Sequence, residues 1–269
     1  MRGEGVSIAA IICAAGSSSR MGGNKKEYQQ LKSASPEGIP LSVLGVAVSA
    51  FVSCSQISPI VIVLPEREKA EDRARFQGVI MEELRLLDPY CNPVRSEPQT
   101  GKGQSRILFV QGGPSRRISV HKALAFLEEY NPSYVLIHDG ARPWIKKALI
   151  EKIINAVQQY GAVIPAIPMT ETPKELFSPL VSDNQHVSTV PDTYIKRHLR
   201  RAELCVAQTP QGFKFPEILG AHEKAAEREE RGKFEYTDDA ELWADFIGKV
   251  AVISGDAANR KITYPEDLR

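Results

Sequence analysis

Short apolar runs rich in β-branched residues alternate with helix-like segments along most of this chain, and this alternation limits the folds it can adopt. The runs expected to form strands are Ser7–Cys13, Ile60–Leu64, Ile107–Val110, Tyr134–His138, Ala162–Ile167 and Val250–Ile253. The segments expected to form helices are Leu41–Val52, Arg67–Leu87, Ser119–Glu129, Lys147–Tyr160 and Pro216–Arg231. Strands that alternate with helices predict an α/β fold with a mostly parallel, Rossmann-like sheet flanked by helices. Ligands in such sheets bind beyond the carboxyl ends of the strands.

The first apolar run, Val6–Ala15, has two interpretations. It follows Arg2 and ends in small residues, as the apolar region of a secretory signal does. A buried strand of a parallel sheet is also a continuous apolar run. Because this run leads into Gly-Ser-Ser-Ser-Arg and then Lys25-Lys26, which is typical of a phosphate loop, we expect the buried strand. No apolar run approaches the ~20 residues that span a bilayer, so we expect no membrane partner.

Charge and cysteine content narrow the class of protein further. The 269 residues include 34 Lys and Arg against 33 Asp and Glu, which gives a formal net charge of +1. Non-specific nucleic-acid binding needs a concentrated basic surface, so we expect no nucleic-acid partner and only a local basic pocket for phosphates. The cysteines fit neither a CxxC metal pattern nor a dense disulfide framework, which favours reduced thiols and a cytoplasmic location. These cysteines are Cys13, Cys54, Cys91 and Cys205.

Three stretches interrupt the alternation. Lys32–Pro40 and Asp88–Ser105 are rich in Ser, Pro, Gly and polar residues, and we expect them to be surface loops. The third stretch, residues 169–204, contains a short polar–apolar alternation at Val187–Thr193. We interpret 169–204 as a protruding arm used in dimerisation, within a single domain that spans residues 1–269.

The turn after the first strand is the first motif that indicates chemistry. Ala14-Ala15-Gly16-Ser17-Ser18-Ser19-Arg20-Met21 precedes Lys25, Lys26 and Tyr28. Small residues let backbone N–H groups approach a triphosphate, Arg20 can bind phosphate oxygens in a fork, and Lys26 supplies a point charge. The turn is neither a Walker P-loop nor the dinucleotide-binding GxGxxG. Taken alone, it is also compatible with a solvated loop that binds nothing.

A second motif, Ile137-His138-Asp139-Gly140-Ala141-Arg142-Pro143, ends an apolar strand. A carboxylate at a strand end in a phosphate site suits Mg²⁺, which takes one or two carboxylates together with phosphate oxygens. Arg142 is placed to hold a phosphorylated acceptor. The alternatives are a turn or helix-capping role for Asp139 and a surface ion pair for Arg142. We interpret His138 as a packed structural histidine rather than a base.

Two further motifs combine glycines with basic residues. Gly112-Gly113-Pro114-Ser115-Arg116-Arg117-Ile118-Ser119-Val120 leads from a strand into a helix, and Ser119 is expected to be the helix N-cap. Near the end of the chain, Asn259-Arg260-Lys261-Ile262-Thr263 follows a Gly255-Asp256 turn. Of the basic residues in these two motifs, we expect only Lys261 in the site.

The four motifs occur together and in order in one family. The chain resembles the cytidylyltransferases that convert methylerythritol phosphate to its cytidine-diphospho derivative in non-mevalonate isoprenoid synthesis. The matching stretches run through nearly the whole chain: Ala14–Met21, Lys26–Tyr28, Gly112–Val120, His138–Pro143, Glu171–Lys174, Gln208–Phe213, Thr237–Asp239, Asn259–Thr263 and Pro265–Leu268. Each stretch alone is modest support, and the ordered set is strong.

The resemblance implies a role for each matching position. The residues implied to hold CTP are Ala14, Ala15, Gly16, Gly113 and Ser119. The residues implied to surround the α-phosphate as catalytic groups are Arg20, Lys26 and Lys261. Asp139 would meet Mg²⁺ or the acceptor hydroxyls, and Arg142 and Thr209 would line the pocket of the sugar-alcohol phosphate. The family forms homodimers, which implies that the arm gives Thr172, Lys174 and Arg201 to the neighbouring subunit's substrate site.

Departures from the family pattern and three rival functions accompany the resemblance. The departures are Ser18 for a glycine, Pro114 for an acidic residue, Ile118 for a polar residue and Glu171 for Asp. Since the phosphate-binding positions are retained, we expect an active cytidylyltransferase. The nearest rival is a ribitol 5-phosphate cytidylyltransferase, and another is a non-catalytic CTP-binding subunit. A nicotinamide-dependent oxidoreductase fits the first strand and turn but would need the absent GxGxxG.

Overall fold

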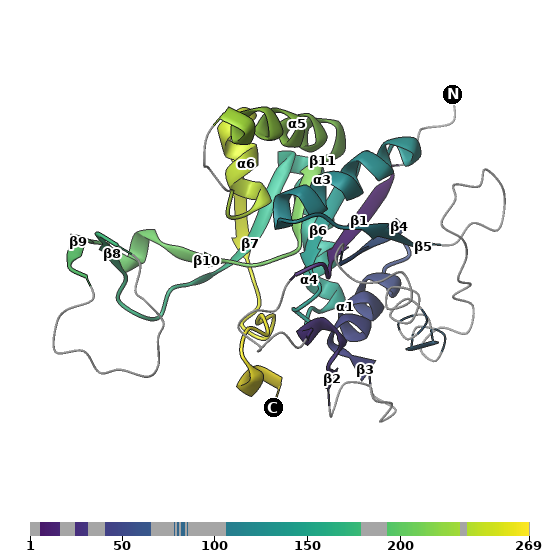
Figure 1. Ribbon diagram of the computed structural model, residues 1–269, viewed down its shortest axis with the longest axis horizontal. Helices are drawn as coiled ribbons and strands as arrows, with labels where there is room; N and C mark the ends of the chain where they lie inside the picture. The colour runs from purple at the N-terminus through teal and green to yellow at the C-terminus, as the bar shows by residue number, and fades with distance from the viewer. Residues whose placement is uncertain are drawn as a thin grey trace.

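Figure 1 shows the computed structural model, which describes residues 6–16, 25–31, 41–65, 78, 80, 82–83, 85, 106–178, 193–231 and 236–268. Within these residues, the strands are β1 (Ile8–Cys13), β2 (Gln30–Leu31), β3 (Leu41–Ser42), β4 (Ile57–Leu64), β5 (Ile107–Gln111), β6 (Tyr134–Asp139), β7 (Ala162–Pro168), β8 (Lys174–Leu176), β9 (Ile195–His198), β10 (Cys205–Ala207), β11 (Gln211–Lys214) and β12 (Ala251–Ser254). The α-helices are α1 (Val43–Val52), α3 (Arg116–Leu127), α4 (Lys147–Tyr160), α5 (Phe215–Arg231) and α6 (Asp239–Phe246). Short 3₁₀ turns are η2 (Lys26–Tyr28), η3 (Glu128–Tyr130), η4 (Arg201–Glu203) and η5 (Pro265–Leu268).

The central sheet joins eight strands in the order β10-β7-β11-β6-β1-β4-β5, with β12 paired to β7. Its middle is parallel, because β1 pairs in parallel with both β4 and β6, and β4 pairs in parallel with β5. β11 runs antiparallel between β6 and β7. The carboxyl ends of β1, β4, β5 and β6 therefore meet at one edge of the sheet. This arrangement confirms the predicted mostly parallel α/β fold.

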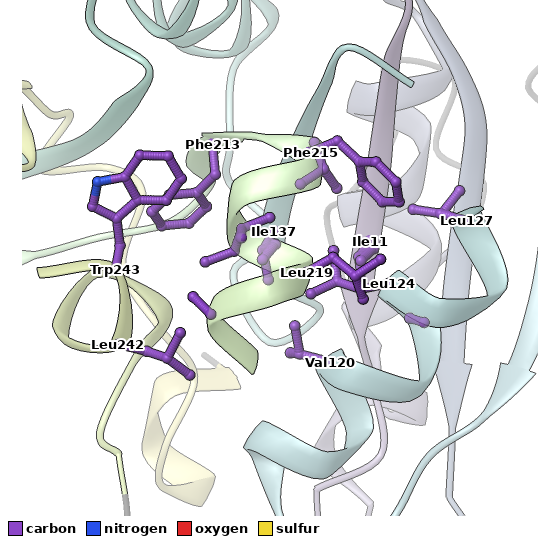
Figure 2. Close-up of a cluster of buried hydrophobic side chains, with 14 of the residues drawn as sticks. Ile11, Val120, Leu124, Leu127, Ile137, Phe213, Phe215, Leu219, Leu242 and Trp243 are labelled. Carbon is purple, nitrogen blue, oxygen red and sulfur yellow. The ribbon is translucent and has the colours of Figure 1, made fainter. Parts of the chain in front are cut away.

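Both faces of the sheet are buried, which explains the continuous apolar runs. Along β1, Ile8, Ala10 and Ile12 pack into a core with α1 and α4, whereas Ala9 and Ile11 pack into a second core with α3, α5 and α6. The two helical layers lie on opposite sides of the sheet (Figure 1). Figure 2 shows the second core, in which Phe213 of β11 stacks on Trp243 of α6 with ring centroids 5.5 Å apart. β1 is thus the buried strand that the sequence predicts.

The predicted elements differ from the structure mainly at their ends and at the antiparallel strands. Helix α3 begins at Arg116, three residues before the predicted start. Its N-cap is Ser115, whose hydroxyl accepts the Ile118 N–H at 3.2 Å, so the prediction that Ser119 is the N-cap is wrong. Helix α6 and strands β10 and β11 are not among the elements predicted from the sequence. The predicted loops Lys32–Pro40 and Asp88–Ser105 lie outside the described residues, as does most of the predicted helix Arg67–Leu87.

Residues 169–178 and 193–204, the described parts of the predicted arm, lie outside the central sheet, as expected. Strands β8 and β9 pair with each other in a separate antiparallel ribbon, which Figure 1 shows well to one side of the sheet. The described part of this segment exposes large apolar side chains, with Phe177 71% and Tyr194 70% exposed. Its use in dimerisation stays a prediction. None of the helices that the structure describes has the length and apolar character to cross a membrane.

Candidate functional site

Two adjacent residues at the end of β6 point to opposite faces of the sheet. His138 follows Leu136 on the face covered by α1 and α4, where its ring lies 5.0 Å from that of Phe51. Asp139 follows Ile137 on the face covered by α3, α5 and α6. The period of two along a strand sets this difference. It places the carboxylate of Asp139 at the carboxyl edge of the sheet, next to the start of α3.

Three cations surround the Asp139 carboxylate. Lys261 Nζ lies 2.8 Å from Oδ2, Arg142 Nε lies 3.6 Å from the same oxygen, and Arg116 Nε lies 3.7 Å from Oδ1. Burial alone would raise the pKa of Asp139, but the charges of Lys261, Arg116 and Arg142 outweigh burial and hold that pKa well below its usual range. The carboxylate therefore stays ionised, and the cluster keeps a surplus of positive charge.

Hydrogen bonds behind Asp139 fix the strand end. The Asp139 N–H donates to Thr209 Oγ1 at 3.0 Å, and the same hydroxyl lies 3.0 Å from His138 Nδ1. His138 Nε2 lies 3.2 Å from the Arg142 carbonyl oxygen. Because a carbonyl only accepts, Nε2 donates and Nδ1 accepts the Thr209 hydroxyl hydrogen. His138 is thus a buried ring with both nitrogens bonded, which confirms its interpretation as structural.

The segment that carries Lys261 is held against the end of β6 by side chains. Arg142 Nη1 donates to the Asn259 carbonyl at 2.9 Å, and Gln208 Nε2 donates to the Asp256 carbonyl at 2.8 Å. Asn259, which is fully buried, donates from Nδ2 to the Thr209 carbonyl at 2.8 Å. Arg142 and Thr209 therefore hydrogen-bond to the segment that carries Lys261 and help to hold it at the end of β6. Their predicted contacts with the acceptor stay predictions.

The predicted nucleotide-binding residues lie in two loops and in the first turn of α3, at the same edge of the sheet. Ala14, Ala15 and Gly16 follow β1, and the Ala14 N–H donates to the Val63 carbonyl of β4 at 3.0 Å. Gly113 follows β5, and its N–H donates to Ser119 Oγ at 2.9 Å. Ser119 is 3% exposed, and its buried hydroxyl fixes the backbone of the glycine loop at Gly113. Gly112 lies directly against Ala15, so the structure brings the two loops together, and their predicted binding of CTP stays a prediction.

The phosphate-loop cations are only partly described. Arg20 lies within residues 17–24, which are outside the described residues. Lys25 Nζ donates to the Gly16 carbonyl at 3.0 Å, so the chain returns to the end of β1 after these residues. Lys26 then begins η2, next to the start of α1, where the Gln29 carbonyl accepts the Val43 N–H at 2.9 Å. The described residues thus place Lys26 just after the loop that the sequence assigns to phosphate.

The arm residues do not reach this site within one chain. Thr172 is exposed beside β8, and Arg201 Nη1 donates to the Thr170 carbonyl at 2.6 Å. Figure 1 places the ribbon of β8 and β9 away from the ends of β1 and β6. The role of Thr172 and Arg201 in a neighbouring subunit's substrate site stays a prediction.

Sequence reasoning missed Arg116 and Asp239. Arg116 Nη2 donates to Asp239 Oδ2 at 2.8 Å, while its Nε faces Asp139. Burial alone would raise the pKa of Asp239, but Arg116 and the hydrogen bond from His222 lower it to about 2. Of the basic residues in the Gly112–Val120 and Asn259–Thr263 motifs, only Lys261 was expected in the site. The contact of Arg116 with Asp139 shows that this expectation is wrong. The signal for Asp239 in the sequence is that Thr237–Asp239 matches the family pattern.

A mostly parallel sheet that gathers cations and glycine loops at its carboxyl edge is the arrangement of an α/β protein that binds phosphate-bearing ligands. Residues 8–269 match the family model of 2-C-methyl-D-erythritol 4-phosphate cytidylyltransferase, IspD. The chain belongs to this family.

Individual relatives agree with this assignment. The bifunctional enzyme IspD/IspF of Nitrobacter hamburgensis is 36% identical over 262 residues, which cover 97% of this chain and 53% of the relative. The 2-C-methyl-D-erythritol 4-phosphate cytidylyltransferase of Bacillus mycoides is 33% identical and covers 96% of this chain and 93% of the relative. The crystal structure of the 4-diphosphocytidyl-2C-methyl-D-erythritol synthase of Anaerococcus prevotii is similar with a TM-score of 0.69 at 27% identity, over 98% of this chain and 94% of that one. The chain spans about half the length of bifunctional relatives such as the Nitrobacter enzyme.

The buried His138 ring predicts a measurable loss of stability in mild acid. Burial is the main reason why its pKa falls to about 4 from 6.5. Between these values the unfolded chain binds a proton that the folded chain does not, so the contribution of His138 is complete above pH 6.5 and is lost as pH falls toward 4. Each pH unit below 6.5 lowers the free energy of unfolding by about 1.4 kcal/mol, so the loss at pH 5 is about 2 kcal/mol.

Urea unfolding of the wild-type chain and of His138→Gln tests this expectation. The variant should be less stable at pH 7.5, and the difference between the two chains should shrink by about 2 kcal/mol at pH 5. Curves that stay parallel between pH 7.5 and 5 would show that the ring titrates alike in both states.

Proposed function

We propose that this chain transfers CMP from CTP to 2-C-methyl-D-erythritol 4-phosphate, which gives 4-diphosphocytidyl-2-C-methyl-D-erythritol and pyrophosphate. The observation that carries the proposal is the ion cluster of Asp139 with Lys261 and Arg116 at the edge where the two glycine loops meet, in a chain of the IspD family. The Bacillus mycoides relative, matched over nearly its whole length, bears the name of this activity.

The reaction needs charge and position more than covalent chemistry from the protein. An oxygen of the acceptor phosphate attacks the α-phosphorus of CTP, the new P–O bond forms in line, and the bond to the β-phosphate oxygen breaks as pyrophosphate leaves. Negative charge grows on the leaving oxygens. Cations that are already fixed stabilise that charge without reorganisation, which is the role we assign to Arg20, Lys26 and Lys261.

Mg²⁺ fits this site as an ion held mainly by the nucleotide. Among the residues that the structure describes, no group of three or more His, Cys, Asp or Glu side chains could hold a metal, so the protein would offer the Asp139 carboxylate. Oδ2 accepts Lys261 at 2.8 Å, which leaves Oδ1 with its longer 3.7 Å contact to Arg116 as the oxygen for the ion. One carboxylate completed by phosphate oxygens and water is a usual Mg²⁺ arrangement, and the bound ion would neutralise triphosphate charge.

Purified protein assayed with CTP, Mg²⁺ and each of two acceptors tests the proposed activity. Pyrophosphate should be released with 2-C-methyl-D-erythritol 4-phosphate and much more slowly with ribitol 5-phosphate. Faster turnover of ribitol 5-phosphate would assign the rival acceptor. CTP binding without pyrophosphate release with either acceptor would instead indicate a non-catalytic subunit.

Lys26 provides a kinetic test of the mechanism. Preorganised donors to transition-state charge are worth about 3–4 kcal/mol each, so Lys26→Ala should lower kcat by roughly 10²–10³-fold and change CTP affinity much less. Lys224→Ala is the matched control, because Lys224 is exposed on α5 and should leave kcat unchanged. If Lys26→Ala weakened CTP binding and left kcat intact, Lys26 would be a ground-state ligand and the role assigned to it would be wrong.

We also propose that the chain acts as a homodimer in the cytoplasm, with the arm against a second copy. The exposed Phe177, Tyr194 and Ile195 side chains of the β8–β9 ribbon support an apolar contact. The three described cysteines are free, which suits a reducing compartment.

Light scattering should give twice the chain mass at assay concentration. Replacing Phe177 and Tyr194 with Ser should shift the chain toward monomer and lower activity together. A fully active wild-type monomer would refute the shared site.

A further inference from the structure

A row of charged and polar side chains runs from the ion cluster into the helical layer, half-buried at Arg116 and buried beyond it. Arg116 Nη2 donates to Asp239 Oδ2 at 2.8 Å, and His222 Nε2 donates to Asp239 Oδ1 at 3.2 Å. His222 on α5 is fully buried, and Asp239 at the start of α6 is 1% exposed. The row therefore joins α5, α6 and α3 to Asp139 at the end of β6.

The two oxygens of Asp239 have different donors, and this determines how the carboxylate is turned. A carboxylate can rotate about its last bond, and one donor alone fixes its direction poorly. His222 holds Oδ1, so Oδ2 must face Arg116. The Arg116 guanidinium is in turn held with Nε toward Asp139, 3.7 Å from Oδ1 of that residue. His222 thus sets the direction of Arg116 through Asp239.

The neighbours of His222 and Asp239 leave little freedom for other arrangements. His222 stacks on His121 of α3 with ring centroids 6.0 Å apart, and its buried Nδ1 has no hydrogen-bond partner. The bond to Asp239 is therefore what orients the ring. At the start of α6, Asp238 Oδ1 accepts the Glu241 N–H at 2.8 Å, and Gln211 Oε1 accepts the Ala240 N–H at 3.2 Å. These caps fix the backbone that carries Asp239.

We propose that His222 is a positioning residue for nucleotide binding, which acts through Asp239 to hold Arg116 at the triphosphate side of the ion cluster. This inference rests on the proposed function, since it takes CTP as the ligand. A guanidinium that is already directed loses less rotational freedom when phosphate oxygens bind it. The simpler alternative is that His222 only helps to dock α5 on α6.

Three variants separate positioning from docking. His222→Leu removes the donor and keeps an apolar side chain of similar bulk in the core. His222→Gln keeps an N–H near the place of Nε2. Asp245→Asn is the matched control, because Asp245 of α6 accepts Arg228 of α5 at 2.7 Å and so joins the same two helices without touching Arg116. Thermal unfolding of all three shows how much each change loosens the fold.

The measurement is the CTP dissociation constant by titration calorimetry with Mg²⁺, at a temperature where every variant is folded. His222→Leu should raise that constant by up to about tenfold, because CTP binding must then immobilise an Arg116 side chain that His222 no longer directs. His222→Gln should return it to within about threefold of wild type. Asp245→Asn should leave it unchanged even where stability falls. In an Arg116→Ala background, His222→Leu should have no further effect.

The outcomes distinguish this inference from the proposed function. A normal CTP affinity in His222→Leu, or equal losses in His222→Leu and Asp245→Asn, would reduce His222 to a docking residue while transfer activity stands. If the wild-type chain bound CTP and released no pyrophosphate, the proposed function would fail and the affinity series would still judge His222. A wild-type chain that binds no CTP would overturn both.

Discussion

The Asp139 carboxylate is the group on which the arrangement of the site depends. A buried carboxylate without partners is very costly, and here one partner, Arg142, is three residues further along the chain, whereas Arg116 starts α3 and Lys261 follows β12. One negative charge thus holds two distant segments at a single strand end. With Asp239 included, the group has three cations and two carboxylates, so one positive charge remains to attract a polyanion.

The position of that carboxylate follows from strand geometry. Because neighbouring residues of β6 face opposite layers, His138 is buried against α1 and bonded at both nitrogens, whereas Asp139 reaches the cations of the other layer. The Thr209 hydroxyl joins the two, since it accepts from the Asp139 N–H and donates to His138. Adjacent residues of β6 therefore differ in their contacts: His138 supports the strand end, and Asp139 binds the cations. A shift of register by one residue would exchange them.

The sequence predicted the parallel strands well, because each is buried on both faces and reads as a continuous apolar run. β11 was missed, because Gln211–Lys214 is short and includes Gly212 and a charged residue. Arg116 was missed because the helix was started at Ser119, which left Arg116 in the preceding loop. With the N-cap at Ser115, Arg116 becomes the first helical residue and faces Asp139, while Arg117 turns to Glu229 at 2.7 Å. The Asp239 contact joins residues far apart in sequence, and spacing carries no signal for it.

Small residues at the sheet edge act through packing as much as through access to a ligand. A Cβ added to Gly112 would lie 2.7 Å from the Ala15 Cβ and 2.9 Å from Ser119 Oγ, and one added to Gly140 would lie 3.0 Å from the Cys13 carbonyl oxygen. The described residues that follow β1, β5 and β6 therefore pack directly against one another. Close packing of this kind resists displacement, because no space remains for a loop to move into without loss of contacts. These closely packed residues support the cations of α3 and of the Lys261 segment. Charges that are fixed in this way can stabilise a reaction without first rearranging.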